Sequence, residues 1–330
     1  MSQSKNDKEM LTAAHTNSDP NPRGGTVSRR SLLMAGGAAT LAVPLLTGQN
    51  ALADDADEYS EMKKVQKLGS TRENYWDPSG KFFVQKNVDN SKVDKGILRA
   101  RVDGTWQEFV NREIDDAFFD HNIAMRLRMF EVMTGTKQYE IYNDAHNAAV
   151  GTYGSNRGDS RFHVNVAFKG MGWLPTPSRI DARIKELEEN YTTSMMKKMQ
   201  LLYAGYHDKT LWDKRIIGSL ELYTTQESET HTFLNQMINP VASICTLGSE
   251  SYEFRVVTRL LHPEDPGLSD YEKKAVKYIN FAHDFFHGGP NPNKLFVHNI
   301  GVLYYVVEEF DNSPFGATDT AGGQKRVPLA

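Results

Sequence analysis

The sequence predicts a mainly α fold: one domain of about seven helices with at most one or two short strands. Apolar residues recur three and four positions apart through most of the chain after residue 104. Glycines and prolines separate these runs, as they do between helices. Ser269-Asp270-Tyr271-Glu272 is a capping-box pattern, which is typical of a helix start.

The first predicted helix covers residues 105–133, and Gly135 follows it as a C-terminal cap would. A second helix is expected over residues 139–150. The period then changes, because apolar and other residues alternate over residues 162–168. Alternation of this kind predicts an isolated strand or an extended crossing segment. Five more helices are expected, over residues 178–204, 209–238, 250–261, 270–287 and 294–310.

The domain organisation follows from composition. Residues 1–53 are expected to form a leader that is removed, and residues 54–80, rich in charged residues and Ser, to form a solvated arm. Residues 81–312 are expected to make the helical domain. Residues 313–330, rich in Gly and Thr, are expected to be a flexible tail.

The leader carries a transport signal. Arg29 and Arg30 precede a weakly apolar run over residues 35–46, and Ala51-Leu52-Ala53 offers the small residues that a signal peptidase cuts. This apolar run falls short of the roughly 20 residues that a membrane-spanning helix needs. The mature chain is therefore expected to have no membrane span.

The segment around the two arginines resembles the twin-arginine (Tat) signal family, whose consensus is Ser-Arg-Arg-x-Phe-Leu-Lys. Leu32 stands in place of the Phe and Met34 in place of the Lys, while Arg29 and Arg30 are kept. The resemblance implies passage of the folded chain through the Tat translocase into the periplasm. Proteins exported in this way commonly fold around a cofactor or with a partner before they cross.

Charge and cysteine content exclude several classes of function. The chain holds 38 basic and 42 acidic residues. The leader takes five of the basic and three of the acidic ones, so the mature part is more acidic still, which argues against nucleic acid as a partner. Cys245 is the only cysteine, so disulfides within the chain and sites built on paired cysteines are excluded. Glycine-rich phosphate-binding motifs are absent from the sequence.

The sharpest candidate for chemistry is the pair His283 and His287, because spacing of four places two imidazoles on one helical face. Glu227 and His231 have the same spacing, and Asp116 could complete a ligand shell. Imidazoles with carboxylates suit Fe, Mn or Zn. The alternative interpretations are structural: His287 at a helix C-terminus is favoured by the helix dipole, and Asp116 belongs to a solvated face.

Two functional hypotheses follow. In the first, the protein is the accessory (small) subunit of a periplasmic oxidoreductase, exported together with a larger catalytic subunit. A helical chain with an export signal is similar in architecture and signal to the small Tat-exported subunits of periplasmic flavin-dependent dehydrogenases. No motif within the mature chain matches that family, so no site residue is assigned from it. In the second, the chain is itself a periplasmic metal-dependent redox enzyme that uses His283 and His287. An exposed apolar patch would favour the first hypothesis, and convergence of three ligands would favour the second.

Overall fold

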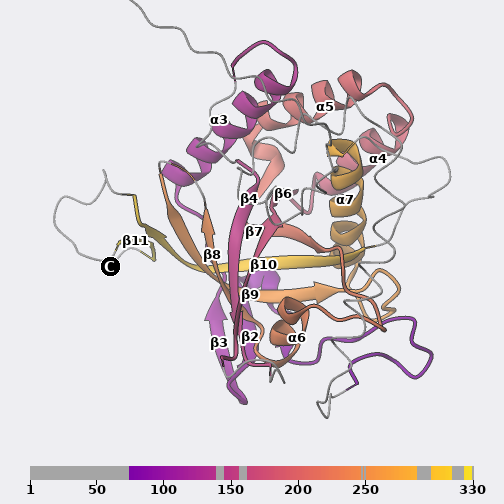
Figure 1. Cartoon of the computed structure of the whole chain (residues 1–330), viewed down its shortest axis with the longest axis vertical. Helices are drawn as coiled ribbons and strands as arrows, with labels where there is room; N and C mark the ends of the chain where they lie inside the picture. Colours follow the sequence, from indigo (N-terminus) through magenta and orange to yellow (C-terminus); the bar gives the residue numbers. More distant parts are fainter. Residues whose placement is uncertain are drawn as a thin grey trace, which may run out of the picture. The chain divides into compact units, whose positions relative to one another are not determined.

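The computed structural model describes residues 74–138, 145–155, 162–246, 248, 250–287, 299–313 and 323–328. All of them belong to one compact unit, Ala56–Ala330. Within these residues the chain forms eleven strands in antiparallel sheets and five α-helices (Figure 1). The fold is therefore mixed α/β, and the prediction of a mainly α protein is wrong.

The strands fall into two sheets. The smaller sheet contains β1 (Val88–Asp89), β2 (Ile97–Val102) and β3 (Thr105–Val110). The larger sheet contains β4 (Asn147–Tyr153), β5 (Val164–Gly170), β6 (Gly172–Pro175), β7 (Trp212–Glu221), β8 (Val241–Thr246), β9 (Tyr252–Leu261), β10 (Ile300–Asp311) and β11 (Gln324–Val327). The helices are α3 (Asp116–Met133), α4 (Ile180–Glu189), α5 (Met195–His207), α6 (His231–Ile238) and α7 (Asp270–Phe286).

The larger sheet curls into a half-barrel. Its strand order is β5-β4-β8-β9-β10-β7-β6, with β11 paired to β10. β5 and β6 stand at opposite ends of this order, yet only Met171 separates Gly170 at the end of β5 from Gly172 at the start of β6. A single residue cannot span a flat sheet of seven strands, so the two ends must come together. The Ser219 hydroxyl of β7 donates to the carbonyl oxygen of Gly170 at 2.7 Å, which holds this seam closed.

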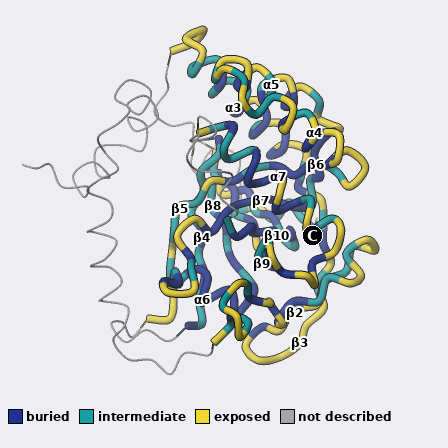
Figure 2. The backbone as a smooth tube through the Cα atoms, turned by 90° about the vertical axis from the view of Figure 1, so that its right-hand side faces the viewer, coloured by how far each residue is buried: buried dark blue, intermediate teal, exposed yellow. Residues whose placement is uncertain are grey.

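The helices cover the sheet in two places. α3, α4, α5 and α7 pack on one another. α7 and α3 also pack on the strands of the half-barrel, α3 through Phe118 on Phe254 of β9, while α6 lies against β4 and β5 (Figure 1). The middle strands of the larger sheet are largely buried, whereas the outer turns of α3 and α5 are exposed (Figure 2).

Two glycines let α7 approach the sheet closely. A Cβ atom on Gly301 of β10 would lie 2.9 Å from Cγ2 of Val276, and one on Gly218 of β7 would lie 3.2 Å from Cδ1 of Ile279. Both distances are shorter than ordinary van der Waals contact. The position of α7, and of the histidines at its end, therefore depends on these two strand positions having no side chain.

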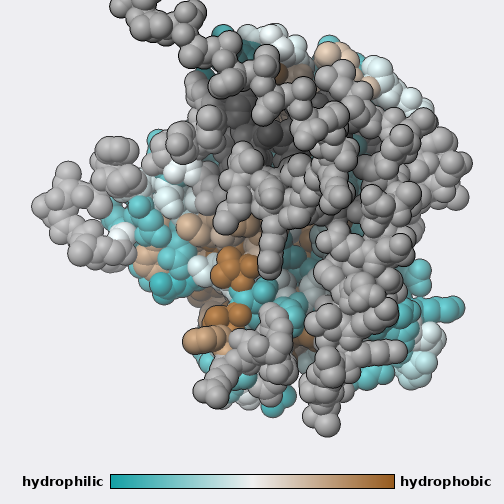
Figure 3. Space-filling view, in the orientation of Figure 1, coloured by the Kyte–Doolittle hydropathy of each residue, from teal (hydrophilic) through white to brown (hydrophobic). Residues whose placement is uncertain are grey.

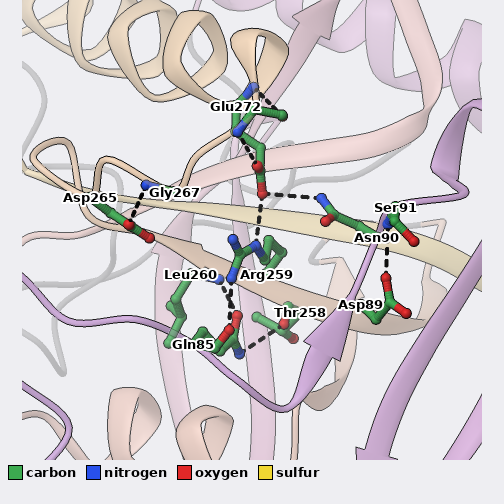
Figure 4. Close-up of polar contacts among 11 residues, drawn as sticks. Gln85, Asp89, Asn90, Ser91, Thr258, Arg259, Leu260, Asp265, Gly267 and Glu272 are labelled. Carbon is green, nitrogen blue, oxygen red and sulfur yellow. Dashed lines mark hydrogen bonds and ion pairs between the residues drawn. The ribbon is translucent and has the colours of Figure 1, made fainter.

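A buried polar network joins α7 to the N-terminal segment (Figure 4). Nε of Arg259 donates to Oε1 of Glu272 at 2.7 Å, and Nη1 of Arg259 donates to the carbonyl oxygen of Gln85 at 3.0 Å. The side-chain amide of Gln85 donates to the carbonyl oxygen of Thr258, and its oxygen accepts from the backbone N–H of Leu260. This network satisfies polar groups of β9 that would otherwise be costly to bury.

Several predicted helices are strands. Residues 250–261 contain β9, and the described part of 294–310 is β10. The predicted helix over 209–238 is β7 followed by a loop and the short helix α6. Residues 105–110 form β3, and the described end of 139–150 belongs to β4.

The misassignment of β10 has a clear physical cause. Ile300–Val306 of this strand are all buried, so the sequence there is a continuous apolar run without alternation, and shorter apolar runs occur beside charged residues in β7 and β9. Such runs match the helical period by chance. Their content of Val, Ile and Tyr is the signal that favours strands.

Other predicted features are confirmed. The Ser269–Glu272 capping box opens α7, with Oγ of Ser269 accepting from the backbone N–H of Glu272 at 3.2 Å and Glu272 accepting from that of Ser269. Gly135 follows α3 with a φ of 76°, as a glycine after a helix commonly does. Residues 164–168 are extended, as predicted, but they belong to β5, which pairs with β4 and is not an isolated strand. The predicted helix over 178–204 divides into α4 and α5, because residues 190–194 leave the helical conformation.

The ends of the domain differ from the predicted arm and tail where the structure describes them. Trp76 is buried, and its Nε1 donates to Oε1 of Glu229 at 3.0 Å. Gln324–Val327 of the predicted tail forms β11 on β10. The signal with Arg29 and Arg30 lies outside the described residues. Within the described part of the chain, no helix is both long enough and apolar enough to cross a membrane.

Candidate functional site

The two histidines singled out from the sequence lie together at the C-terminal end of α7. The ring centroids of His283 and His287 are 4.5 Å apart, with the ring planes inclined by 43°. Nδ1 of His283 lies 3.5 Å from Oδ1 of Asp284, whose other oxygen accepts from the hydroxyl of Tyr191 at 2.7 Å. The spacing of four thus places both imidazoles on one face of the helix, as the sequence predicted.

The second predicted pair, Glu227 and His231, does not share a helix. His231 is the first residue of α6, while Glu227 lies in the loop before it. Oε2 of Glu227 accepts from the hydroxyl of Thr225 at 2.9 Å. The prediction of two ligands on one helical face is wrong here, because Thr230 caps the helix and the helical spacing begins only after it.

Asp116 is placed far along α3 from the histidines. Its side chain is exposed, and its Oδ1 accepts from Nζ of Lys214 at 2.6 Å. This hydrogen bond and the charge of Lys214 lower the pKa of Asp116. The first residue of α3 that lines the pocket beside His283 and His287 is Arg126. Asp116 lies ten residues before Arg126, which is about 15 Å along the helix. The interpretation of Asp116 as part of a solvated face fits this position.

The predicted metal shell therefore does not assemble. Across the ranges that the structure describes, no three His, Cys, Asp or Glu side chains are grouped so that they could hold a metal ion. His283 and His287 meet, but Glu227, His231 and Asp116 belong to other parts of the fold.

His283 and His287 instead form part of a pocket, here called the histidine pocket. It has a volume of about 140 Å³ and lies between α3, α5, α7 and the seam at Met171. A third imidazole, that of His146, also lines it. The His146 ring lies 4.8 Å from the ring of Phe286, which in turn lies 5.1 Å from the ring of His287.

The environment keeps His287 neutral at pH 7. Burial, together with the neighbouring imidazoles of His283 and His146, lowers the pKa of His287 to about 4. The helix dipole, which would favour a charged imidazole at this C-terminus, is outweighed by burial. His287 can therefore offer the pocket one N–H donor and one nitrogen acceptor.

Arg126 of α3 is the cationic residue of the pocket wall, and it is almost fully buried, with 5% of its surface exposed. Its Nε donates to Oδ1 of Asn122 at 2.7 Å, its Nη1 to the Tyr206 hydroxyl at 3.2 Å and its Nη2 to the carbonyl oxygen of Met171 at 2.9 Å. All three acceptors are neutral.

A second feature lies on the outer face of β5. Phe162, Val164, Val166 and Phe168 occur at alternate positions and point to one side of the strand, with 62–74% of each residue exposed. We call these four residues the apolar row. Asn165, between two members of the row, and Lys169, just after its end, point the other way, where Asn165 donates to Thr232 and Lys169 pairs with the buried Glu221.

The apolar row borders a groove of about 550 Å³ between the half-barrel and the small sheet. Val164 and Val166 form one wall, and the other walls combine polar residues, such as Arg255 and Glu308, with apolar residues of β3, β8, β9 and β10, among them Phe109, Val241, Val257 and Val307. Figure 3 shows strongly hydrophobic residues gathered on the face that carries β4 in Figure 1.

Sequence reasoning missed His146, Arg126 and the apolar character of the β5 surface. His146 has no histidine or carboxylate partner at helical spacing in the predicted helix, and only the curl of the sheet brings it to α7. Arg126 lies within a helix whose period is recognisable, but no local pattern marks an arginine as buried. The alternation in β5 is visible in the sequence, yet it does not say which face meets solvent.

Comparison with known proteins adds little to this geometry. No protein-family model and no curated protein matches the chain. One similar solved structure is the 1.70 Å crystal structure of HupZ from Group A Streptococcus, carrying V5 and hexahistidine tags, with 13% sequence identity and a TM-score of 0.27. The match covers 51% of this chain and 86% of that one.

Proposed function

We propose that this protein is the accessory subunit of an exported oxidoreductase and that it crosses the membrane through the Tat translocase together with a larger catalytic subunit. It acts in the periplasm in this proposal. The observation that carries the proposal is the apolar row on β5, which presents a surface suited to another protein. The paired arginines Arg29 and Arg30 support the route of export.

The apolar row is unusual for a surface in contact with water. Single exposed apolar side chains are common, but a contiguous group on a monomer commonly marks an interaction site. Here Val164, Val166 and Phe168 follow one another along the outer face of one strand, and Phe162 extends the row beyond its end. Covering these side chains with a partner would remove their apolar surface from water, which is the main favourable term in protein association.

β5 also has the backbone position of a docking strand. It stands at one end of the sheet order, pairs with β4 along one side, and meets β7 at the seam through its last residue, Gly170. Edge strands are commonly protected by charged side chains, which point outward or inward, or by a proline. The outward positions of β5 hold no charge and no proline, and the charge of its inward residue Lys169 is neutralised by the buried Glu221.

The groove beside the row gives the partner a shape to fit. Its apolar lining suits inserted aromatic or aliphatic side chains, which dominate the free energy of binding at protein interfaces. Because the row and the groove share Val164 and Val166, one partner segment could cover both. A catalytic subunit that lacks its own signal would be retained during export by such a contact.

The experiment is co-purification from the periplasm of the native host, with the wild-type chain and two variants compared. Val166→Glu places a charge in the middle of the row. Val110→Glu is the matched control, because Val110 is also an exposed strand valine, but it lies outside the groove that its neighbour Phe109 lines. The proposal predicts that a larger oxidoreductase subunit accompanies the wild type and Val110→Glu but is lost from Val166→Glu.

Three outcomes would contradict the proposal. One is a wild-type chain that purifies alone, and another is Val166→Glu retaining the same partner. The third is self-association through the row, with a second copy as the occupant. A stoichiometric metal that disappears in His283→Ala would instead favour the metal-dependent alternative.

A further inference from the structure

We propose that the histidine pocket binds a small carboxylate with an apolar body, such as a single aromatic ring or a short aliphatic chain. This site is separate from the apolar row and does not depend on the accessory role. Three properties of the pocket carry the inference: its size, the charge of Arg126, which has no carboxylate partner in the described part of the chain, and the composition of the remaining wall.

The size of the pocket limits the ligand. An apolar cavity of about 150 Å³ in a protein interior accommodates benzene. The histidine pocket, at about 140 Å³, therefore has room for one ring or a chain of similar bulk. Leu222 lines the pocket and is 41% exposed, so the pocket wall reaches the molecular surface.

Arg126 supplies a charge that has no counterion among the residues that the structure describes. A guanidinium has five N–H donors, and within the described residues the three bonds to Asn122, Tyr206 and Met171 leave two of them without an acceptor. Among the described residues, no carboxylate lies within 4.0 Å of this side chain, although Arg259 and Arg183, which are as deeply buried, each pair with a glutamate. A buried charge is costly unless it is paired, and a ligand carboxylate would pair it with the geometry that arginine prefers.

The rest of the described wall favours the same ligand. It contains no Asp or Glu that would repel an anion. Asp284, which lies beside His283, is directed to Tyr191 and does not line the pocket. The imidazoles add hydrogen-bonding groups, while the body of the ligand would contact apolar side chains that include Phe130, Trp173 and Ile279.

The charge and the apolar lining together distinguish a carboxylate from other ligands. A metal cation would be repelled by Arg126, and a neutral aromatic molecule would leave the guanidinium unpaired. Inorganic phosphate would pair with Arg126 but would lie against apolar side chains that cannot hydrogen-bond to it. A molecule with one anionic end and one apolar end satisfies both parts of the wall.

The test is titration calorimetry of the full chain with benzoate and hexanoate, and with benzamide and inorganic phosphate as comparison ligands. The proposal predicts saturable binding of benzoate or hexanoate, with benzamide and phosphate at least tenfold weaker. Arg126→Gln is expected to weaken carboxylate binding at least tenfold. Arg101→Gln, which neutralises an exposed arginine of β2, is expected to leave it unchanged.

A second variant keeps the test decisive if Arg126→Gln does not fold. Ala282→Phe adds a ring to the pocket wall from α7 and is expected to abolish carboxylate binding while the melting temperature stays near that of the wild type. The inference is overturned if neither carboxylate binds, if benzamide or phosphate binds as tightly as they do, or if folded Ala282→Phe binds them unchanged.

Discussion

Arg259 and Glu272 form an ion pair at 2.7 Å in which both side chains are buried, with 8% and 3% exposed. Glu272 has a double role, because it also closes the capping box at the start of α7. Burial would raise the pKa of Glu272, but the charge and hydrogen bonds of Arg259 outweigh it, and the net effect is a lowered pKa. The pair thus fixes the start of the helix whose other end carries the histidines.

Glu272→Gln is expected to destabilise the fold by about 3–5 kcal/mol, because it leaves the charge of Arg259 buried without a counterion. Glu188→Gln is the control, since Glu188 pairs with Lys277 at the surface and should cost below about 1 kcal/mol. Urea unfolding at pH 7 measures both. Because the folded pKa of Glu272 is lowered, its contribution is present above the unfolded pKa and is lost as the pH falls through the folded value. Equal effects of the two variants would contradict this role.

Gly301→Val is expected to destabilise the fold by about 1–3 kcal/mol, because the added side chain would collide with Val276 and push α7 from β10. Gly172→Val is the control, since a Cβ at Gly172 meets no atom within 4 Å. Thermal unfolding of the two variants gives the comparison. A Gly301→Val variant as stable as the control would show that α7 tolerates displacement.

Glu309 is expected to make the fold less stable as the pH rises, whereas Glu272 makes it less stable as the pH falls. Burial, opposed in part by the backbone N–H of Asp115, raises the pKa of Glu309 to about 7. A raised folded pKa gives stability that is present below the unfolded value of about 4.5 and is lost as the pH rises through about 7. Glu309→Gln should therefore be more stable than the wild type at pH 8, by roughly 1–3 kcal/mol, with little advantage at pH 4.5.

Urea unfolding of Glu309→Gln across pH 4.5–8 tests this expectation. Glu108→Gln, at an exposed position of β3, is the control and should follow the wild-type curve. A free energy of unfolding of Glu309→Gln that differs from the wild-type value by the same amount at every pH would contradict the raised pKa of Glu309.

Replacing both Arg29 and Arg30 by Lys is expected to stop export, because in the proposed route the Tat translocase recognises the paired arginines. The precursor should accumulate in the cytoplasm, and the proposed catalytic subunit should remain there with it. Lys5→Arg together with Lys8→Arg is a control of equal charge in the leader. Fractionation followed by immunoblotting detects both chains. Normal periplasmic amounts of the double Lys variant would refute the proposed route.

The sequence predicts correctly those structural features that depend on interactions between neighbouring residues. The Ser269–Glu272 box and Gly135 each depend on a few neighbouring residues, and the sequence predicts both correctly. The buried strands are not predicted, because the run in β10 owes its continuous apolar character to neighbours on both faces.

The candidate site also combines residues that a local pattern predicts with residues that only the tertiary fold brings together. His283 and His287 meet because the helix that carries them sets their spacing. Arg126 and His146 reach the same pocket only because Met171 joins the two ends of the curled sheet. No pattern within the chain encodes that meeting, since it depends on the register of strands far apart in sequence.

The central claim is that the apolar row on β5 holds a catalytic subunit. Hydrogen–deuterium exchange of the chain alone and in its purified complex tests it most directly. The account predicts slower exchange in the complex for Val164–Gly170 of β5, with exchange in α4, away from the row, unchanged. Protection elsewhere in the chain, with β5 exchanging equally in both states, would contradict it.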